Sequence, residues 1–246
     1  MFVIYTPSII LIAAAVIPAI LLLWMVHHHD KVEPEPPALL LRLVLMGIIA
    51  TTIAKLLEHA GVALLNAIFR QPTLLYEVLL YFGVVGFAEE GAKYGLLKRT
   101  TWRSPFFNCR FDGLVYAAFV SLGFALWENI GYVLMYGMGT AYLRALTAVP
   151  GHACFGVFMG CWYAQAKEAS RTGREDFSRG LRVGAVLVPA LLHGAYDFLA
   201  ANSYYHSGWL FIAFVVVLFI ATFTVLRKFA REDRYIYEGQ RFPFVS

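Results

Sequence analysis

Residues 112–136 read DGLVYAAFVSLGFALWENIGYVLMY, and between Asp112 and Tyr136 the one charged side chain is that of Glu128. A helix of about 20 mostly apolar residues crosses the hydrocarbon core of a bilayer. The whole chain shares this composition, since 60% of its 246 residues are hydrophobic and 15% are charged. A soluble domain is about a quarter charged. A soluble globule and a disordered chain are therefore excluded, and the stretch predicts a membrane-spanning helix with a carboxylate inside it.

Similar apolar stretches recur along the chain and predict an all-α fold, a polytopic transmembrane helical bundle of about seven spans. The predicted spans are 3–26, 38–58, 73–97, 112–136, 143–165, 183–202 and 208–226. The first has no Lys or Arg before it and no small-residue cleavage site after it, so we expect a retained helix and not a signal peptide. Residues 58–72 are more polar, and they either extend the second helix or form a short surface helix. We interpret residues 1–246 as a single integral membrane domain.

The basic residues predict how the bundle is oriented. With seven spans, most Lys and Arg residues fall on one side of the membrane, in the segments 27–37, 98–111, 166–182 and 227–246. The opposite side receives Arg70 and Arg144. Loops rich in Lys and Arg remain in the cytoplasm. We therefore expect a cytoplasmic C-terminal tail and an N-terminus outside; an extra crossing before the third span would reverse only the N-terminus.

The remaining composition excludes two other classes of protein. The net charge of +4 is too small to indicate a nucleic-acid-binding protein. The three cysteines, Cys109, Cys154 and Cys161, form neither an even disulfide set nor a CxxC ligand pair.

Ionisable residues stand well away from the ends of four of the predicted spans. A charged group at the bilayer centre costs at least ~2.5–3.5 kcal/mol, so such groups usually serve a function and face a shared interior. They are Glu89, Glu90 and Lys93 in FAEEGAK, Glu128 in FALWEN, His152 in PGHACFG, and His193 and Asp197 in HGAYD. We expect these side chains to converge on one water-accessible cavity.

Their spacing predicts two local pairings. Lys93 follows Glu90 by three residues and Glu89 by four, so its ammonium can neutralise either carboxylate. Asp197 follows His193 by four residues on the same helix face, where it can accept an imidazole N–H and orient the ring.

These acidic and histidine side chains can catalyse hydrolysis by either of two mechanisms. A catalytic zinc needs three protein ligands and an open position for water; Glu128, His152 and His193 could supply the ligands, with Glu89 or Glu90 as the base. In a metal-free mechanism a glutamate and a histidine would activate water directly. A proton-coupled transporter uses the same residue types within its spans. The residue types alone do not separate these alternatives.

The order of the motifs resembles the PrsW family of membrane proteases. EExxK at Glu89 to Lys93, FxxxEN at Phe124 to Asn129, a histidine in a glycine-flanked span and HxxxD at His193 to Asp197 carry the resemblance. It covers roughly residues 73–202, which we expect to form a catalytic core of four helices. The pattern is distantly similar to glutamate-type CAAX prenyl proteases and bacteriocin-processing homologues, which typically have EExxxR and FxxxH. This chain has EExxK and FxxxEN at those places instead, and this difference favours a PrsW-like activity.

The resemblance implies an intramembrane protease in the plasma membrane of a prokaryote. Its substrate would be a membrane-anchored protein of the anti-sigma-factor type, and its partners would include the lipid bilayer but no nucleic acid. CAAX-type prenyl-protein or peptide processing is the second enzymatic interpretation. Carried over residue by residue, the catalytic set is Glu89, Glu90, Glu128, His152 and His193, with Lys93, Asn129 and Asp197 in support. One divalent metal such as zinc, held by Glu128, His152 and His193, is the cofactor to test.

Overall fold

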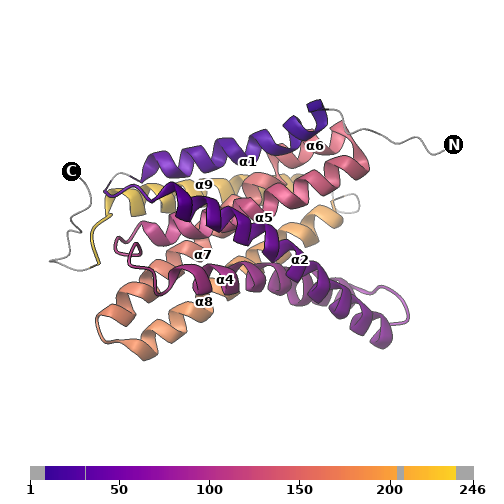
Figure 1. Cartoon of the computed structure of the whole chain (residues 1–246). Coiled ribbons are helices and arrows are strands. Elements are labelled where there is room, and N and C mark those ends of the chain that lie inside the picture. The colour runs from indigo at the N-terminus through magenta and orange to yellow at the C-terminus, as the bar shows by residue number, and fades with distance from the viewer. Residues whose placement is uncertain (1–8, 31, 204–207, 237–246) are drawn as a thin grey trace.

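The computed structural model describes residues 9–30, 32–203 and 208–236, and it is helical almost throughout (Figure 1). The elements are α1 (Ile9–His29), α2 (Pro37–Ile68), α3 (Leu74–Val78), η1 (Leu79–Gly86), α4 (Phe87–Thr101), α5 (Asp112–Tyr136), α6 (Met138–Leu146), α7 (Ala148–Arg171), α8 (Glu175–Ala201) and α9 (Trp209–Arg231). The all-α prediction is confirmed. Within the described ranges the only β pairing is an isolated bridge between Cys109 and Tyr235.

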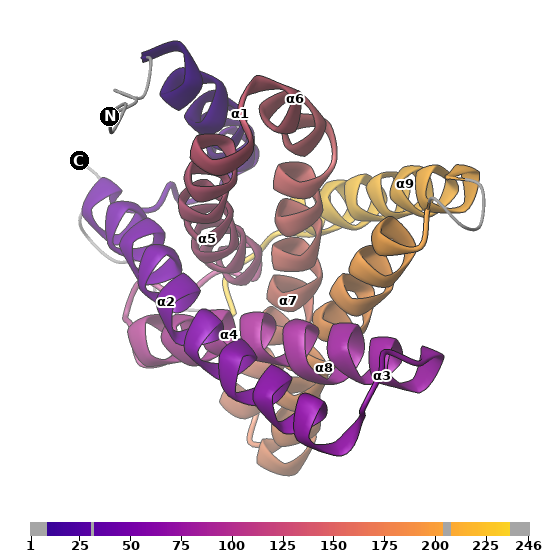
Figure 2. The same cartoon turned by 90° about the vertical axis from the view of Figure 1, so that its right-hand side faces the viewer.

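The bundle is built around α5 and α7, which pack closely on each other. A Cβ added at Gly160 of α7 would lie 2.5 Å from the Gly113 carbonyl oxygen and from the Leu114 Cα of α5. Such small residues let membrane helices approach closely. Helices α1 and α2 contact α5, and α8 and α9 contact α7. Figure 2 shows α2 crossing over α4, a contact that brings α2 to the third helical segment.

The third helical segment changes its hydrogen-bonding pattern immediately before the charged motif. Thr73 begins the segment, since its side-chain oxygen accepts a hydrogen bond from the Tyr76 N–H at 3.2 Å. The helix is α-helical in α3, π-helical in η1 and α-helical again in α4, with no break at either junction. Short π-helical segments inside α-helices are frequent at functional sites.

Within the part of the chain that the structure describes, six helices are long and apolar enough to cross a membrane: α1, α2, α5, the continuous segment Met138–Arg171, α8 and α9. The third predicted span, 73–97, falls on α3, η1 and α4, where the charged residues of α4 lower the hydropathy. A count of seven therefore remains a prediction. Residues 58–72 extend α2 to Ile68, the first of the two alternatives. Helix α9 continues to Arg231, into the predicted tail 227–246, and residues 237–246 of that tail lie outside the described residues.

Four of the basic segments meet at one end of the bundle. The Arg110 N–H donates to the Arg234 carbonyl oxygen at 3.0 Å, and Arg234 pairs with Glu168 at 2.8 Å. The Asn108 side chain donates to Glu33 of the α1–α2 loop at 3.2 Å. This arrangement agrees with one shared side for these segments, and their cytoplasmic location stays a prediction.

Candidate active site

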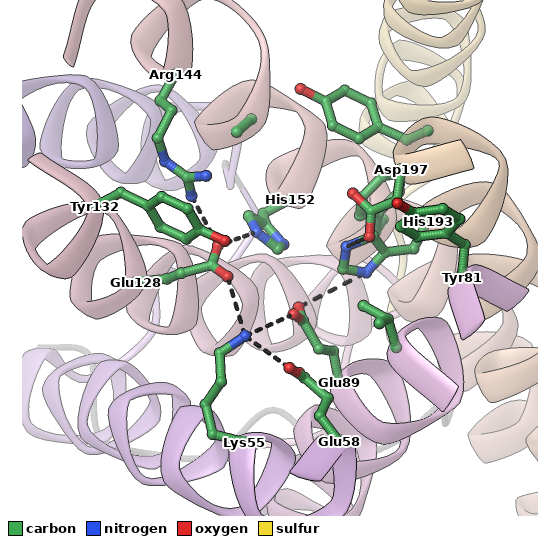
Figure 3. A pocket seen from close by; sticks show the side chains of 14 residues that line it. Lys55, Glu58, Tyr81, Glu89, Glu128, Tyr132, Arg144, His152, His193 and Asp197 are labelled. Atoms are coloured by element: carbon green, nitrogen blue, oxygen red, sulfur yellow. Dashed lines mark hydrogen bonds and ion pairs between the residues drawn. The ribbon is translucent and has the colours of Figure 1, made fainter. Parts of the chain in front are cut away.

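A cavity of about 240 Å³ opens between α2, α4, α5, α7 and α8 and is surrounded by ionisable side chains (Figure 3). The residues that line it are Lys55, Glu58, Tyr81, Val85, Glu89, Glu128, Tyr132, Arg144, Ala148, His152, Phe155, His193, Tyr196 and Asp197. The predicted convergence is therefore observed for Glu89, Glu128, His152 and His193. Glu90 does not line the cavity, but it contacts His193, which does.

The two adjacent glutamates of α4 face different surroundings. Glu89 lines the cavity, whereas Glu90 does not and is wholly buried. Lys93, also wholly buried, places its Nζ 2.8 Å from Glu90 Oε1 and 3.4 Å from Glu89 Oε2. The i,i+3 and i,i+4 pairing expected from the sequence is present, and Glu90 is the nearer partner.

His193 is held between two carboxylates. Its Nδ1 lies 2.9 Å from Glu90 Oε1, and its Nε2 lies 3.5 Å from Asp197 Oδ2. The ring also stacks on Phe155 with 4.7 Å between ring centroids. Because a hydrogen bond at Nδ1, the nearby Asp197 carboxylate at Nε2 and stacking on one face restrict rotation, the orientation of His193 is fixed. Asp197 lies where the HxxxD spacing predicts.

His152 connects Lys93 to Glu128. Its Nδ1 lies 3.1 Å from Lys93 Nζ, and its Nε2 lies 3.1 Å from Glu128 Oε2. An ammonium group can only donate, so Nδ1 accepts and the ring proton is on Nε2, which donates to Glu128. Lys93 also lies 3.9 Å from the centre of the Phe124 ring, an arrangement that favours a buried cation.

Glu128 and Asn129 share a third partner, Arg144. Arg144 Nη2 lies 2.7 Å from Glu128 Oε2, and its Nε donates to Asn129 Oδ1 at 3.0 Å. The Asn129 amide then donates to the Ala15 carbonyl oxygen of α1 at 2.7 Å. Asn129 therefore positions the arginine and does not itself line the cavity.

Sequence reasoning did not place Lys55, Glu58 and Arg144 in the site. Figure 3 shows Lys55 directed toward Glu58, Glu89 and Glu128, and the Nζ–oxygen distances are 2.8, 3.8 and 3.7 Å. The signal for Lys55 was available, because it is a cation within the second predicted span. Arg144 gave no such signal, because it lies near the end of a span.

One set of side chains gathers closely enough to hold a metal ion. Candidate ligand atoms of Glu89, Glu90, His152 and His193 all lie within 4.8 Å of one another, the one such set found in the described ranges. Glu90 Oε2 is buried without a hydrogen-bond partner, so it is free to act as a ligand. Two imidazoles and two carboxylates are a donor set that zinc accepts. Glu128, one of the three predicted ligands, is not in this set.

The carboxylates at the site outnumber the lysine and arginine cations that face them. Glu58, Glu89, Glu90, Glu128 and Asp197 contribute five carboxylates. They face three cations, Lys55, Lys93 and Arg144. Because isolated charges are costly inside a membrane, protons on the histidines or a divalent ion would balance the excess.

The chain is similar to proteins of one family over most of its length. The family model described as "PrsW family intramembrane metalloprotease" matches residues 35–226. Protease PrsW of Bacillus subtilis (strain 168) is 36% identical over 143 residues, which span 58% of this chain and 62% of that protein. Protease PrsW of Clostridioides difficile (strain 630) is 29% identical over 83% of this chain and 85% of its own. The protein of that name from Halalkalibacterium halodurans is 33% identical over 72% and 77%, respectively. No solved structure matches.

Proposed function

The chain belongs to the PrsW family of intramembrane metalloproteases, and from this premise we propose that its buried cavity hydrolyses a peptide bond of a membrane-anchored protein. It is a multi-pass membrane peptidase of prokaryotic type. The roles of the individual residues, the substrate and the metal are parts of the proposal. A transporter interpretation of the same residues finds no support in these relatives.

The position of Glu89 carries the proposal. Its carboxylate is 2% exposed, lines the cavity and lies opposite Glu128 across Lys55. The residues that line the described cavity include no Ser, Thr or Cys. Water is therefore the nucleophile that this cavity can offer, and a carboxylate within hydrogen-bond reach is the base that activates it.

In the metal-free form of the proposed reaction Glu89 removes a proton from a water molecule as the water oxygen bonds to the scissile carbonyl carbon. The carbonyl oxygen gains negative charge, which the cationic side chains of Lys55 and Arg144 can stabilise across the cavity. Glu89 then returns the proton to the amide nitrogen as the C–N bond breaks. The reaction yields one new carboxylate and one new amine terminus.

Glu90, Lys93 and Asp197 act in this proposal through their neighbours. Glu90 and Asp197 hold the His193 ring from both sides, so that the ring faces the cavity. Lys93 fixes the tautomer of His152 and balances the charge of Glu90. This division makes Glu89 the base and Glu90 a positioning residue.

Glu89, Glu90, His152 and His193 are the residues that would hold a metal ion. When bound, zinc polarises a carbonyl and acidifies water. This donor set replaces the predicted one, since Glu128 Oε2 is already engaged by Arg144 and His152. Lys93 Nζ lies within 3.4 Å of ligand atoms of Glu89, Glu90 and His152. Metal binding therefore requires its ammonium to move away or lose its proton.

We propose that the catalytic core includes α2 in addition to the predicted residues 73–202. Lys55 and Glu58 of α2 line the cavity beside Glu89, so the second helix belongs to the core. The proposed substrate is a single-pass membrane protein of the anti-sigma-factor type, as the family resemblance implies. The end of the bundle that carries the basic loops would face the cytoplasm.

The purified full chain, reconstituted with a single-pass membrane substrate, tests this function. We expect Glu89→Gln to lower the cleavage rate by roughly 10²–10⁴-fold, because it removes the base. Glu77→Gln is the matched control, since Glu77 lies on the same helical segment, outside the cavity, where it accepts a hydrogen bond from Asn202. Near-normal cleavage by Glu89→Gln, with the same folded fraction as the control, would reject the assignment.

A further inference from the structure

A second group of acidic residues lies outside the candidate active site, at the end of the bundle that carries the basic loops. Three separate segments contribute to it: Asp30 and Glu35 from the α1–α2 loop, Asp112 from the start of α5, and Asp233 from the segment after α9. Asp30 repels Glu35 and Asp233, and Glu35 repels Asp112, so the four carboxylates are neighbours. We refer to these four residues as the acidic cluster.

Each member of the acidic cluster has a buried carboxylate oxygen with no hydrogen-bond partner. These atoms are both oxygens of Asp30, Oε2 of Glu35, Oδ1 of Asp112 and Oδ2 of Asp233. Asp30 and Glu35 are each 5% exposed, and Asp112 is completely buried. Buried polar groups are nearly always paired, and an orphaned one requires an explanation such as an ion that binds there.

In three of the four residues the second oxygen is firmly held. The Tyr116 hydroxyl donates to Glu35 Oε1 at 2.6 Å. The Cys109 N–H donates to Asp112 Oδ2 at 2.7 Å, and the Phe111 N–H donates to Asp233 Oδ1 at 2.8 Å. Each of these carboxylates is thus oriented by one oxygen. The Glu35 and Asp112 side chains also lie close enough to hydrogen-bond each other when one of them is protonated, and a bound cation would replace that proton.

Lys167 and Arg110 are the described cations that act on the acidic cluster, Lys167 on Asp112 and Arg110 on Asp233. Among the described residues, no Lys or Arg forms an ion pair with Asp30, Glu35 or Asp112. Arg110 attracts Asp233 but also pairs with Glu168 and Glu232. Burial, reinforced by the neighbouring acids, raises the pKa of Asp30 to about 7 and the pKa of Glu35 to about 8. Ionised, these acids would repel one another strongly.

We propose that the acidic cluster binds one hard divalent cation, Ca²⁺ or Mg²⁺. Both ions prefer oxygen ligands, with carboxylates at the centre and water completing the shell. Zinc is not favoured, because the cluster offers no imidazole and the buried Cys109 thiol has a raised pKa that keeps it protonated. The carboxylates are spaced more widely than the ligand atoms of the candidate active site, so binding would draw the three segments together.

Thermal unfolding of the purified full chain, stripped of metal and held at a pH above the raised pKa values, tests this site. Adding CaCl₂ or MgCl₂ should raise the Tm, because a ligand that binds only the folded state stabilises it. Asp30→Asn should have two opposite effects. It should raise the Tm in chelator, because the ionised Asp30 carboxylate is buried and repels its acidic neighbours. It should also remove most of the rise that the cation produces.

Matched variants separate this site from other sources of stabilisation. Asp176→Asn removes an exposed carboxylate of α8 and should leave the cation effect intact. His193→Ala should also leave it intact, because that variant alters the active-site donor set alone. Glu35→Gln keeps the acceptor for Tyr116 and should weaken the effect as Asp30→Asn does. No rise in Tm with either cation, or a rise that persists in Asp30→Asn and Glu35→Gln, would overturn the proposal. If the rise in Tm is lost only in His193→Ala, the ion binds in the active site, and this result would also overturn the proposal.

Discussion

Replacing Gly86 with Ala should reduce proteolysis while the chain stays folded. Gly86 is buried immediately before α4, three residues from Glu89. A Cβ at this position would lie 2.5 Å from the Ala190 carbonyl oxygen of α8 and 3.2 Å from the Tyr81 carbonyl oxygen. The obstacle on α8 is backbone, so a side-chain rotation cannot relieve the contact.

The size of the effect follows from how far α4 and α8 must separate to relieve this contact. Ordinary contact begins at 3.4 Å, so α4 and α8 must separate by about 0.9 Å, the difference between 3.4 and 2.5 Å. Applied to the 2.9 Å bond between Glu90 and His193, this shift gives roughly 3.8 Å, too long for a hydrogen bond. A misplacement of about 1 Å in a catalytic site costs roughly 10²-fold in rate.

The matched control is Gly91→Ala, in the same helix and next to the same glutamates. A Cβ at Gly91 would meet no atom within 4 Å, and alanine favours a helix over glycine. Cleavage of a reconstituted substrate should therefore be near normal in Gly91→Ala and about 10²-fold slower in Gly86→Ala. Rates are normalised to the folded fraction, measured by circular dichroism. Equal rates in the two variants would refute the argument that this helix contact sets the catalytic geometry.

Two further predictions concern charge at the site. Lys93→Met should destabilise the chain by about 3–5 kcal/mol, because it leaves the buried Glu90 carboxylate without its cation. Unfolding in denaturant measures this loss of stability. An unchanged unfolding midpoint would show that another group balances the charge of Glu90. If an ion is held by Glu89, Glu90, His152 and His193, metal analysis of the purified protein should find it and His152→Ala should lose it. If fully active protein contains no metal, the metal-free mechanism operates, in which a glutamate activates water directly.

The membrane helices and their ionisable residues could be predicted because the cost of burying charge in hydrocarbon is large and local. That argument identified Glu89, Glu128, His152 and His193 from four different helices, and the HxxxD spacing placed Asp197. It could not decide which of Glu89 and Glu90 faces the cavity. They are adjacent on one helix, and the packing of α4 against α8 makes that choice.

Other features depend on contacts between distant segments, which spacing does not show. Lys55 is a charge within the second predicted span, but its partners on α4 and α5 depend on how α2 crosses the bundle. The π-helical segment η1 has no sequence signature in the pattern of apolar residues. The acidic cluster joins Asp30, Asp112 and Asp233 from three regions of the chain, so no local window contains it.

Photo-crosslinking shows directly whether the substrate bond is cleaved in the cavity beside Glu89. A photoreactive amino acid replaces Tyr132, which lines the cavity, in a Glu89→Gln background that should bind the substrate without cleaving it. The same amino acid at Phe223, an exposed position on α9 away from the cavity, is the control. If the cavity is the active site, position 132 should crosslink to the substrate within a few residues of the bond that the wild-type protein cleaves, and position 223 should not crosslink there. Crosslinks near that bond from position 223, with none from position 132, would contradict this assignment.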